Sequence, residues 1–214
     1  MKFIIIVEGR TEKLAIQDFL RRWLDNKLVE KVGVKQRLLS GGKVEQQLKK
    51  QASAHLDKDN EKEILGVIGL LDLYGMSKDF NLEGKIKGPD KLFKERKKTI
   101  EKQVNHDHFK MFFAVHEFEA WLLSDPGIFQ HDYRSEINKY SKSPETVNFT
   151  NHPAKLLQDI YRRKAKGHYK KTTDGPDLFG RLDPHLVYDK CPYFKMMLDE
   201  MVKLALDAKL TLKQ

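Results

Sequence analysis

Acidic side chains follow three strongly apolar segments of the chain. The segments span residues 3–7, 64–71 and 109–115, and the acids after them are Glu8, Asp72, Glu117 and Glu119. Runs this apolar are typical of strands that are buried on both faces in the middle of a parallel sheet. The carboxyl ends of such strands meet at one edge, where open α/β sheets place their ligands. We therefore expect the four carboxylates to lie near one another.

Carboxylates that converge without a partner repel one another and raise each other's pKa. A hard divalent cation removes this conflict, because Mg²⁺ and similar ions prefer oxygen ligands. Such a metal beside a basic surface suits phosphodiester hydrolysis, since it orients the phosphate, activates water and stabilises the leaving oxygen. The pattern predicts Mg²⁺ or Mn²⁺ as cofactor, with Glu8, Asp72, Glu117 and Glu119 as metal ligands and catalytic residues. Glu8 can instead serve as general base to the attacking water.

The spacing leaves the contribution of three acids open. Glu117 and Glu119 share a face on a strand but point about 200° apart on a helix. At most one of them therefore contacts the metal if a helix has already begun, and Glu117, which is closer to the strand, is favoured. Glu12 lies one helical turn after Glu8 and can be a further metal ligand. Its alternative role is that of a favourable charge at a helix N-terminus.

Several basic residues are candidates for binding phosphates. Arg10 follows Glu8 closely and either contacts a phosphate or pairs with Glu12. A basic run between residues 162 and 171 contains Arg162, Arg163, Lys164, Lys166, Lys170 and Lys171. This run can track a nucleic-acid backbone, with Tyr169 available for base stacking. The alternative is an ordinary solvated charged face.

The elements between the acids must bring the strand ends together. The hydrophobic pattern predicts helices over residues 12–32, 43–56 and 91–104, and a short strand over residues 34–39. Gly33 is expected to end the first helix, because glycine is common just after a helix C-terminus. Apolar strands that alternate with helices are typical of a parallel sheet with right-handed crossovers. The expected fold class is therefore α/β.

The pattern changes after Pro126. Residues 132–150 are polar, with a turn over 143–146. Helices are predicted over residues 153–164, 178–182 and 193–208, with a turn over 174–177. We therefore expect an α/β core over residues 1–125 and a basic helical appendage over 126–214 that packs on it. One continuous domain is the alternative.

Composition limits the class of protein. The 214 residues are 40% hydrophobic, which suffices for a real core, and the net charge of +9 suggests a polyanionic partner. No apolar run approaches the ~20 residues that span a bilayer, and no cleavage site of a signal peptide follows Met1. Cys191 is the single cysteine, so an internal disulfide is excluded. These features lead us to expect a cytoplasmic protein without a membrane segment.

Five motifs resemble a known family. They are Val7–Glu12, Leu71–Gly75, His116–Ala120, Leu182–Pro184 and Cys191–Phe194. Together they resemble a bacterial domain-of-unknown-function family in the Toprim group, related to the overcoming-lysogenization-defect nucleases. The resemblance implies a Toprim-like (Rossmann-like) mostly parallel sheet flanked by helices. It also implies a metal-dependent nuclease that acts with a separate ATPase in defence against phage.

One departure from the Toprim pattern bears on activity. Toprim proteins carry Asp-x-Asp after a later strand, whereas this chain has Asp72-Leu73-Tyr74. One metal ligand therefore comes from elsewhere or is absent, and Glu117 or Glu119 can substitute for it. The rival hypothesis is a non-catalytic subunit that binds nucleic acid or a partner. A nucleotidyl transferase is a weaker third possibility. The chain lacks a P-loop, so any ATPase is another protein.

Overall fold

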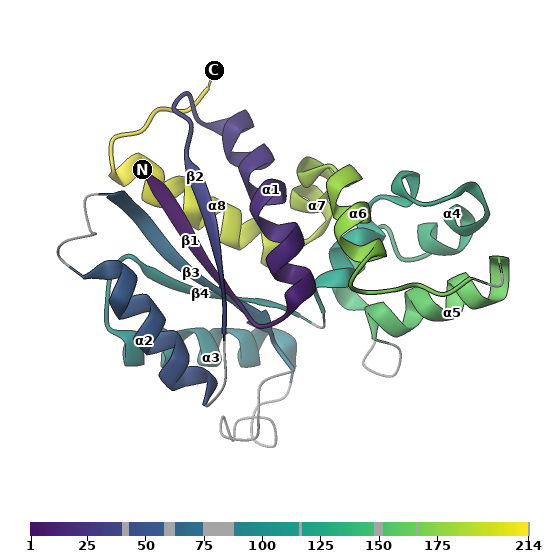
Figure 1. Ribbon diagram of the computed structural model, residues 1–214, viewed down its shortest axis with the longest axis horizontal. Helices are drawn as coiled ribbons and strands as arrows, with labels where there is room; N and C mark the ends of the chain where they lie inside the picture. The colour runs from purple at the N-terminus through teal and green to yellow at the C-terminus, as the bar shows by residue number, and fades with distance from the viewer. Residues whose placement is uncertain are drawn as a thin grey trace.

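A computed structural model gives the structure of the chain (Figure 1). It describes residues 1–39, 43–57, 63–74, 88–115, 117–147, 152–165 and 167–213. Three residues named above, Gly75, His116 and Lys166, lie outside the described residues.

A four-stranded parallel sheet forms the centre of the molecule. Its strands are β1 (Lys2–Val7), β2 (Gly33–Leu38), β3 (Ile64–Asp72) and β4 (Phe109–Ala114), in the spatial order β2-β1-β3-β4. The expected parallel α/β sheet is therefore confirmed. The order reverses between β1 and β3, and this topological switch point is where doubly wound sheets bind ligands. Both strands that flank it end in an acid, Glu8 after β1 and Asp72 on β3.

Helices cover both faces of the sheet. The crossovers are α1 (Arg10–Lys27), α2 (Val44–Leu56) and α3 (Pro89–Val104), and the last helix is α8 (Pro192–Asp207). Figure 1 shows α2 and α3 on one face and α1 and α8 on the other. This split follows from the strand order, because right-handed crossovers in opposite directions lie on opposite faces.

The end of the first helix differs from expectation. Gly33 does not cap α1 but is the first residue of β2. The helix stops at Lys27 because the chain becomes extended at Leu28, which forms an antiparallel bridge with Leu212 near the C-terminus. This pairing joins two distant parts of the sequence and leaves no local signal.

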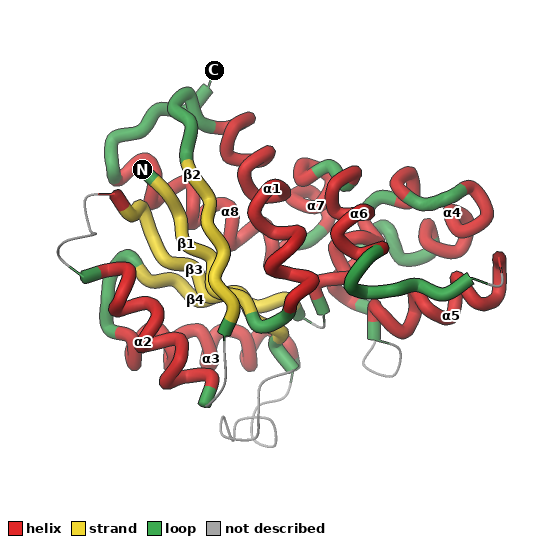
Figure 2. The backbone as a smooth tube through the Cα atoms, in the orientation of Figure 1, coloured by secondary structure: helices red, strands yellow, loops and turns green. Residues whose placement is uncertain are grey.

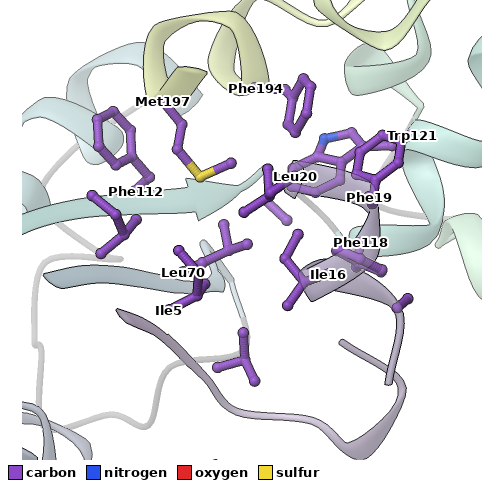
Figure 3. Close-up of a cluster of buried hydrophobic side chains, with 14 of the residues drawn as sticks. Ile5, Ile16, Phe19, Leu20, Leu70, Phe112, Phe118, Trp121, Phe194 and Met197 are labelled. Atoms are coloured by element: carbon purple, nitrogen blue, oxygen red, sulfur yellow. The ribbon is translucent and has the colours of Figure 1, made fainter. Parts of the chain in front are cut away.

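The main core lies between the sheet and the helices α1 and α8. Figure 3 shows Ile5 and Leu70 of the sheet beneath Ile16 and Leu20 of α1, with Met197 of α8 nearby. All five side chains are buried. Burial of a large aliphatic side chain stabilises a fold by about 1.5–3 kcal/mol, so this layer fixes the position of α1 and of the strand ends.

Helices also dominate the part of the chain between β4 and α8 (Figure 2). They are the 3-10 helices η2 (Phe118–Ser124), η3 (Pro126–Ile128) and η4 (Pro144–Thr146) and the α-helices α4 (His131–Asn138), α5 (Pro153–Ala165), α6 (Asp174–Arg181) and α7 (Pro184–Lys190). The expected helical C-terminal part is confirmed. No helix in the described ranges is long and apolar enough to cross a membrane.

The polar segment 132–150 contains most of α4, whose Tyr133 and Ile137 are buried although most of the helix is polar. One local expectation for this part was wrong. The expected turn over residues 174–177 is instead the first turn of α6. The carboxylate of Asp174 accepts a hydrogen bond from the backbone N–H of Lys170 (2.7 Å), and acids in the first turn stabilise a helix through its dipole.

Candidate active site

A small cavity lies at the switch point of the sheet. Its volume is about 10 Å³, and its lining residues are Glu8, Glu12, Leu70, Leu71, Asp72, Ala114 and Phe118. A space of this size holds about one water molecule or one ion. Three of the predicted acids, Glu8, Glu12 and Asp72, therefore line the same cavity. It lies at the edge of the sheet where the sequence pattern predicted that the acids would meet.

Glycine at position 9 brings Glu12 into this group. A Cβ at Gly9 would lie 1.8 Å from Glu12 Oε2, so the carboxylate of Glu12 occupies the space that a side chain would need. The backbone at Gly9 is extended, with φ near −98°, so close approach rather than an unusual conformation explains the glycine. Glu12 Oε2 is buried and has no hydrogen-bond partner among the described residues.

The carboxyl group of Asp72 is strongly perturbed by its surroundings. Burial, the carboxylate of Glu12 and, more weakly, those of Glu119 and Glu117 hold the pKa of Asp72 well above its ordinary value, while Lys171 opposes them. Burial and Glu12 likewise raise the pKa of Glu8. These influences show that acids from three different parts of the chain lie within electrostatic reach of one another. The predicted convergence of the carboxylates is therefore present in the structure.

Glu117 and Glu119 take different roles at the end of β4. Glu117 is extended and its Oε2 accepts a hydrogen bond from the backbone N–H of Ala154 (2.7 Å), in the first turn of α5. Glu119 lies in η2 and its side chain is fully buried. Its Oε2 is 3.0 Å from Lys171 Nζ, and its Oε1 has no hydrogen-bond partner among the described residues. Burial raises the pKa of Glu119, while Lys171 lowers it.

Lys171 enters the acid group from a segment that packs on α1. Thr11 Oγ1 donates a hydrogen bond to the backbone carbonyl of Lys171 (3.4 Å). A Cβ at Gly175 would lie 3.0 Å from Thr11 Cγ2, so α6 also approaches α1 closely here. Burial alone would lower the pKa of Lys171, but Glu119, Glu12 and nearby acids raise it above its ordinary value.

The rest of the basic run lies elsewhere. Arg162 pairs with Asp159 (3.1 Å) and Lys164 lies 3.9 Å from Glu136, in the last turn of α5 with the exposed Arg163. Figure 1 shows α5 running from the sheet to the outer end of the helical part. Lys170 is exposed beside Lys171, and Arg10 is exposed in the first turn of α1.

The proposed stacking role of Tyr169 was wrong. Its side chain is 3% exposed and lies against Tyr161, with 5.7 Å between the ring centroids. The Tyr169 ring packs in the core although its neighbours in the sequence are basic, so it is not available to stack on a base.

The described carboxylates have the donor chemistry that a hard cation requires, but their side chains are not placed in a metal-binding geometry. No group of three or more His, Cys, Asp or Glu side chains within the described ranges is placed to hold a metal ion. However, buried oxygens of Glu12 and Glu119 lack hydrogen-bond donors there, and buried carboxylates ordinarily find a donor, a cation or a proton. Oxygen donors of this kind are those that Mg²⁺ and Mn²⁺ take.

Arg96 supports this site, although the sequence predicted only a helix around it. Its side chain is fully buried and donates a hydrogen bond to the backbone carbonyl of Leu73. The backbone N–H of Leu73 in turn donates to the carbonyl of Ala114 (2.7 Å). Together these bonds fix the chain directly after Asp72. A buried arginine in a lysine-rich helix leaves no pattern that identifies it from the sequence.

The fold and this site define an α/β protein with an acidic group at the switch point of its sheet. The chain belongs to the family described as domain of unknown function (DUF4276), whose model matches residues 7–202. The match extends from the end of β1 into α8 and includes every acid named above. Membership of a domain-of-unknown-function family, expected from the motifs, is thereby confirmed. No curated protein matches the sequence.

Two solved structures are similar to the whole chain. One is the C-terminal region of the OLD protein of Xanthomonas campestris pv. campestris, with 13% identity over 97% of this chain and 95% of that chain, and a TM-score of 0.45. The other is the C-terminal region of the OLD protein of Burkholderia pseudomallei, with 16% identity over 94% of this chain and 96% of that chain, and a TM-score of 0.45.

Proposed function

We propose that this chain is a divalent-metal-dependent nuclease that hydrolyses phosphodiester bonds of DNA or RNA. The observation that carries the proposal is the group of mutually repelling carboxylates at the switch point, of which Glu12 and Glu119 are buried. A fold retains such a destabilising group when it serves a function, and perturbed carboxylates in a cleft are typical of active sites. The net charge of +9 supports a polyanionic substrate.

In this proposal the acids divide into two sets. Glu8, Glu12 and Asp72 line the cavity and would hold Mg²⁺ or Mn²⁺. When bound, the metal supplies activation of water and stabilisation of the leaving oxygen. Glu119 would complete the ligand set or hold Lys171, and Glu117 would contribute the oxygen that does not bind Ala154. Glu8, the exposed member, can alternatively act as general base to the attacking water.

Lys171 and Arg10 would bind the phosphate oxygens. The ammonium group of Lys171 carries three donors, so its pairing with Glu119 leaves others available for a phosphate. Arg10 is exposed in the first turn of α1, where the backbone N–H groups and the helix dipole favour an anion. The exposed residues Arg162, Arg163, Lys164 and Lys170, with Lys166, would contact phosphates farther along the substrate.

The resemblance of the motifs supports a wider role. We propose that the nuclease acts in the bacterial cytoplasm, with a separate ATPase, in defence against phage. Phage plaque counts on cells that carry the gene with its neighbouring genes test this role. Protection should require both Asp72 and the ATPase gene, and protection that survives Asp72→Asn would contradict it.

A non-catalytic binding subunit is the second candidate. Two observations favour it: Tyr74 stands where Toprim proteins carry the second aspartate, and no three described acids are placed for a metal. This candidate predicts nucleic-acid binding that neither Mn²⁺ nor Asp72 affects.

A cleavage assay separates the candidates. Supercoiled DNA, linear DNA and a structured RNA are incubated with Mn²⁺ or Mg²⁺ and with an EDTA control. The proposal predicts metal-dependent cleavage by the wild type and none by Glu8→Ala or Asp72→Asn. Cleavage that persists in both variants would place the activity at another site. Binding without any cleavage would favour the non-catalytic subunit.

A further inference from the structure

A larger cavity lies directly beside the candidate active site. Its volume is about 620 Å³, within the range of small-molecule sites. Val115 lines this cavity, whereas the preceding residue, Ala114, lines the small cavity of the acids. Two consecutive residues at the carboxyl end of β4 therefore line the two cavities, one residue each.

The wall of the larger cavity contains a fixed aromatic ring. The backbone N–H of Tyr193 donates to Glu145 Oε2 (2.9 Å), and its hydroxyl group donates to Asp90. Its ring also packs on Phe93, with 4.9 Å between the centroids. Pro192 precedes it in the first turn of α8 and lines the same wall. A ring held at three points offers a stacking surface at little cost in entropy.

The charged residues that line the cavity are Asp90, Glu145 and Lys190, and both carboxylates already accept hydrogen bonds. Both oxygens of Glu145 already accept hydrogen bonds, from Trp121 Nε1 (3.1 Å) and from the backbone N–H groups of Tyr193 and Phe194. Glu145 is therefore a poor metal ligand. Lys190 Nζ donates to the carbonyl of Ser124 (2.7 Å) and keeps further donors for a phosphate.

We propose that this cavity binds one unstacked base of the nucleic-acid substrate, next to the phosphate that is cleaved. The proposal rests on the nuclease function proposed above and defines its substrate class. A base inside a duplex cannot enter such a cavity, so the substrate must be single-stranded or locally unpaired. Stacking on an aromatic ring is available to every base, so binding there should depend little on sequence.

Filling the cavity tests the proposal. Met196 of α8 lines it and is 43% exposed, so Met196→Trp can fold while narrowing the opening. Leu206→Trp is the matched control, because Leu206 lies on the same helix, is 40% exposed and lines neither cavity. Affinity is measured by fluorescence anisotropy for a short labelled single strand and for the same strand in a duplex, with EDTA to prevent cleavage.

The wild type should bind the single strand more tightly than the duplex. Met196→Trp should weaken single-strand binding about tenfold, and Leu206→Trp should leave it unchanged. Equal affinities for single strand and duplex, or an unchanged affinity in Met196→Trp, would overturn the proposal. An unchanged affinity would leave the cavity to another ligand, such as a peptide of a partner protein.

The thermal shift caused by Mn²⁺ keeps the two proposals separate. Met196→Trp should retain this shift, because Met196 does not contact the acids. If the wild type shows the shift and metal-dependent cleavage while cavity filling has no effect, only the base-binding proposal fails. If the wild type shows neither, the nuclease proposal fails with it.

Discussion

The carboxylates at the switch point repel one another and reduce the stability of the fold, although the proposed function requires them. Asp72 is held by β3 in a position where burial and three other carboxylates disfavour its charge. Nothing in the packing of the sheet requires an acid there, since Leu70 and Leu71 before it are ordinary core residues. Residues selected for function often reduce stability, and their replacement then stabilises the fold.

We predict that Asp72→Asn raises the stability of the metal-free protein and removes its response to metal. The amide carries no charge, so the free energy of unfolding should rise on the order of 1 kcal/mol at neutral pH. Thermal unfolding in EDTA and in Mn²⁺ measures both effects. A lower melting temperature in EDTA, or a Mn²⁺ shift equal to that of the wild type, would contradict this interpretation.

We predict that a side chain at residue 9 would weaken metal binding and leave the stability of the metal-free protein nearly unchanged. Gly9→Ala displaces the carboxylate of Glu12, which would otherwise lie 1.8 Å from the new Cβ, while the backbone angles suit any residue. We expect a weaker Mn²⁺ shift and a nearly unchanged melting temperature in EDTA.

Gly180→Ala is the control for Gly9→Ala. A Cβ at Gly180 in α6 meets open space, so alanine should stabilise the helix by up to about 1 kcal/mol and leave the Mn²⁺ response intact. The same Mn²⁺ response in both variants would show that Glu12 does not contribute to the site.

At the scale of elements, the segment between α5 and α6 supplies the cation of the site. Two neighbouring lysines in it have different surroundings: Lys171 lies 3.0 Å from the buried Glu119, whereas Lys170 is exposed. The sequence alone gives no reason to distinguish the two lysines. The packing of α6 on α1 places only Lys171 beside the acids.

We predict that Lys171→Met abolishes most cleavage and that Lys170→Met does not. Loss of Lys171 leaves the Glu119 carboxylate buried without its cation, so Lys171→Met should also destabilise the metal-free protein. Single-turnover cleavage rates and melting temperatures of both variants provide the measurement. Equal losses in the two variants would mean that the run acts as a diffuse basic surface.

The N-terminus of α8 provides a test of pH dependence. Burial raises the pKa of Glu145 from 4.5 to about 7, although Trp121, Tyr193 and Phe194 donate hydrogen bonds to its carboxylate. Between these pH values the folded chain binds more protons than the unfolded chain, so its stability falls as pH rises. The contribution of protonated Glu145 to the free energy of unfolding is complete below about pH 4.5 and is lost by about pH 7.

We predict that Glu145→Gln flattens this dependence. Denaturant unfolding in EDTA at several pH values between about 4.5 and 8 should show a loss of roughly 3 kcal/mol in the wild type beyond that in the variant. The new amide nitrogen is a donor where a carboxylate oxygen accepted, so the variant should be less stable overall, and the slope is the informative quantity. Parallel curves would contradict the raised pKa.

At the scale of the whole molecule, the helical part and the sheet share their packing. The helix α8 lies on β3 and β4, and α1 contacts both α6 and α7. The expected boundary near residue 125 remains a prediction, since α8 belongs to the appendage in sequence yet packs on the core. The helical part positions Lys171 and the wall of the larger cavity, so the site depends on both parts.

The sequence predicts the acids at the strand ends better than the contacts that these acids make with the helical part. Glu8 and Asp72 were identified because a buried strand and the acid after it are adjacent in the chain, and parallel strands must align their ends. The bond of Glu117 to Ala154 and the pairing of Glu119 with Lys171 join residues far apart in sequence. Such contacts depend on how helices pack, which a single sequence does not encode in any local pattern.

The central claim is that the acids at the switch point bind a divalent metal, and calorimetric titration with Mn²⁺ tests it most directly. Wild type, Asp72→Asn and Gly180→Ala are titrated under the same conditions after removal of metal. We predict saturable binding to the wild type and to Gly180→Ala, and none to Asp72→Asn. Equal binding to Asp72→Asn, or no binding to the wild type, would contradict the claim.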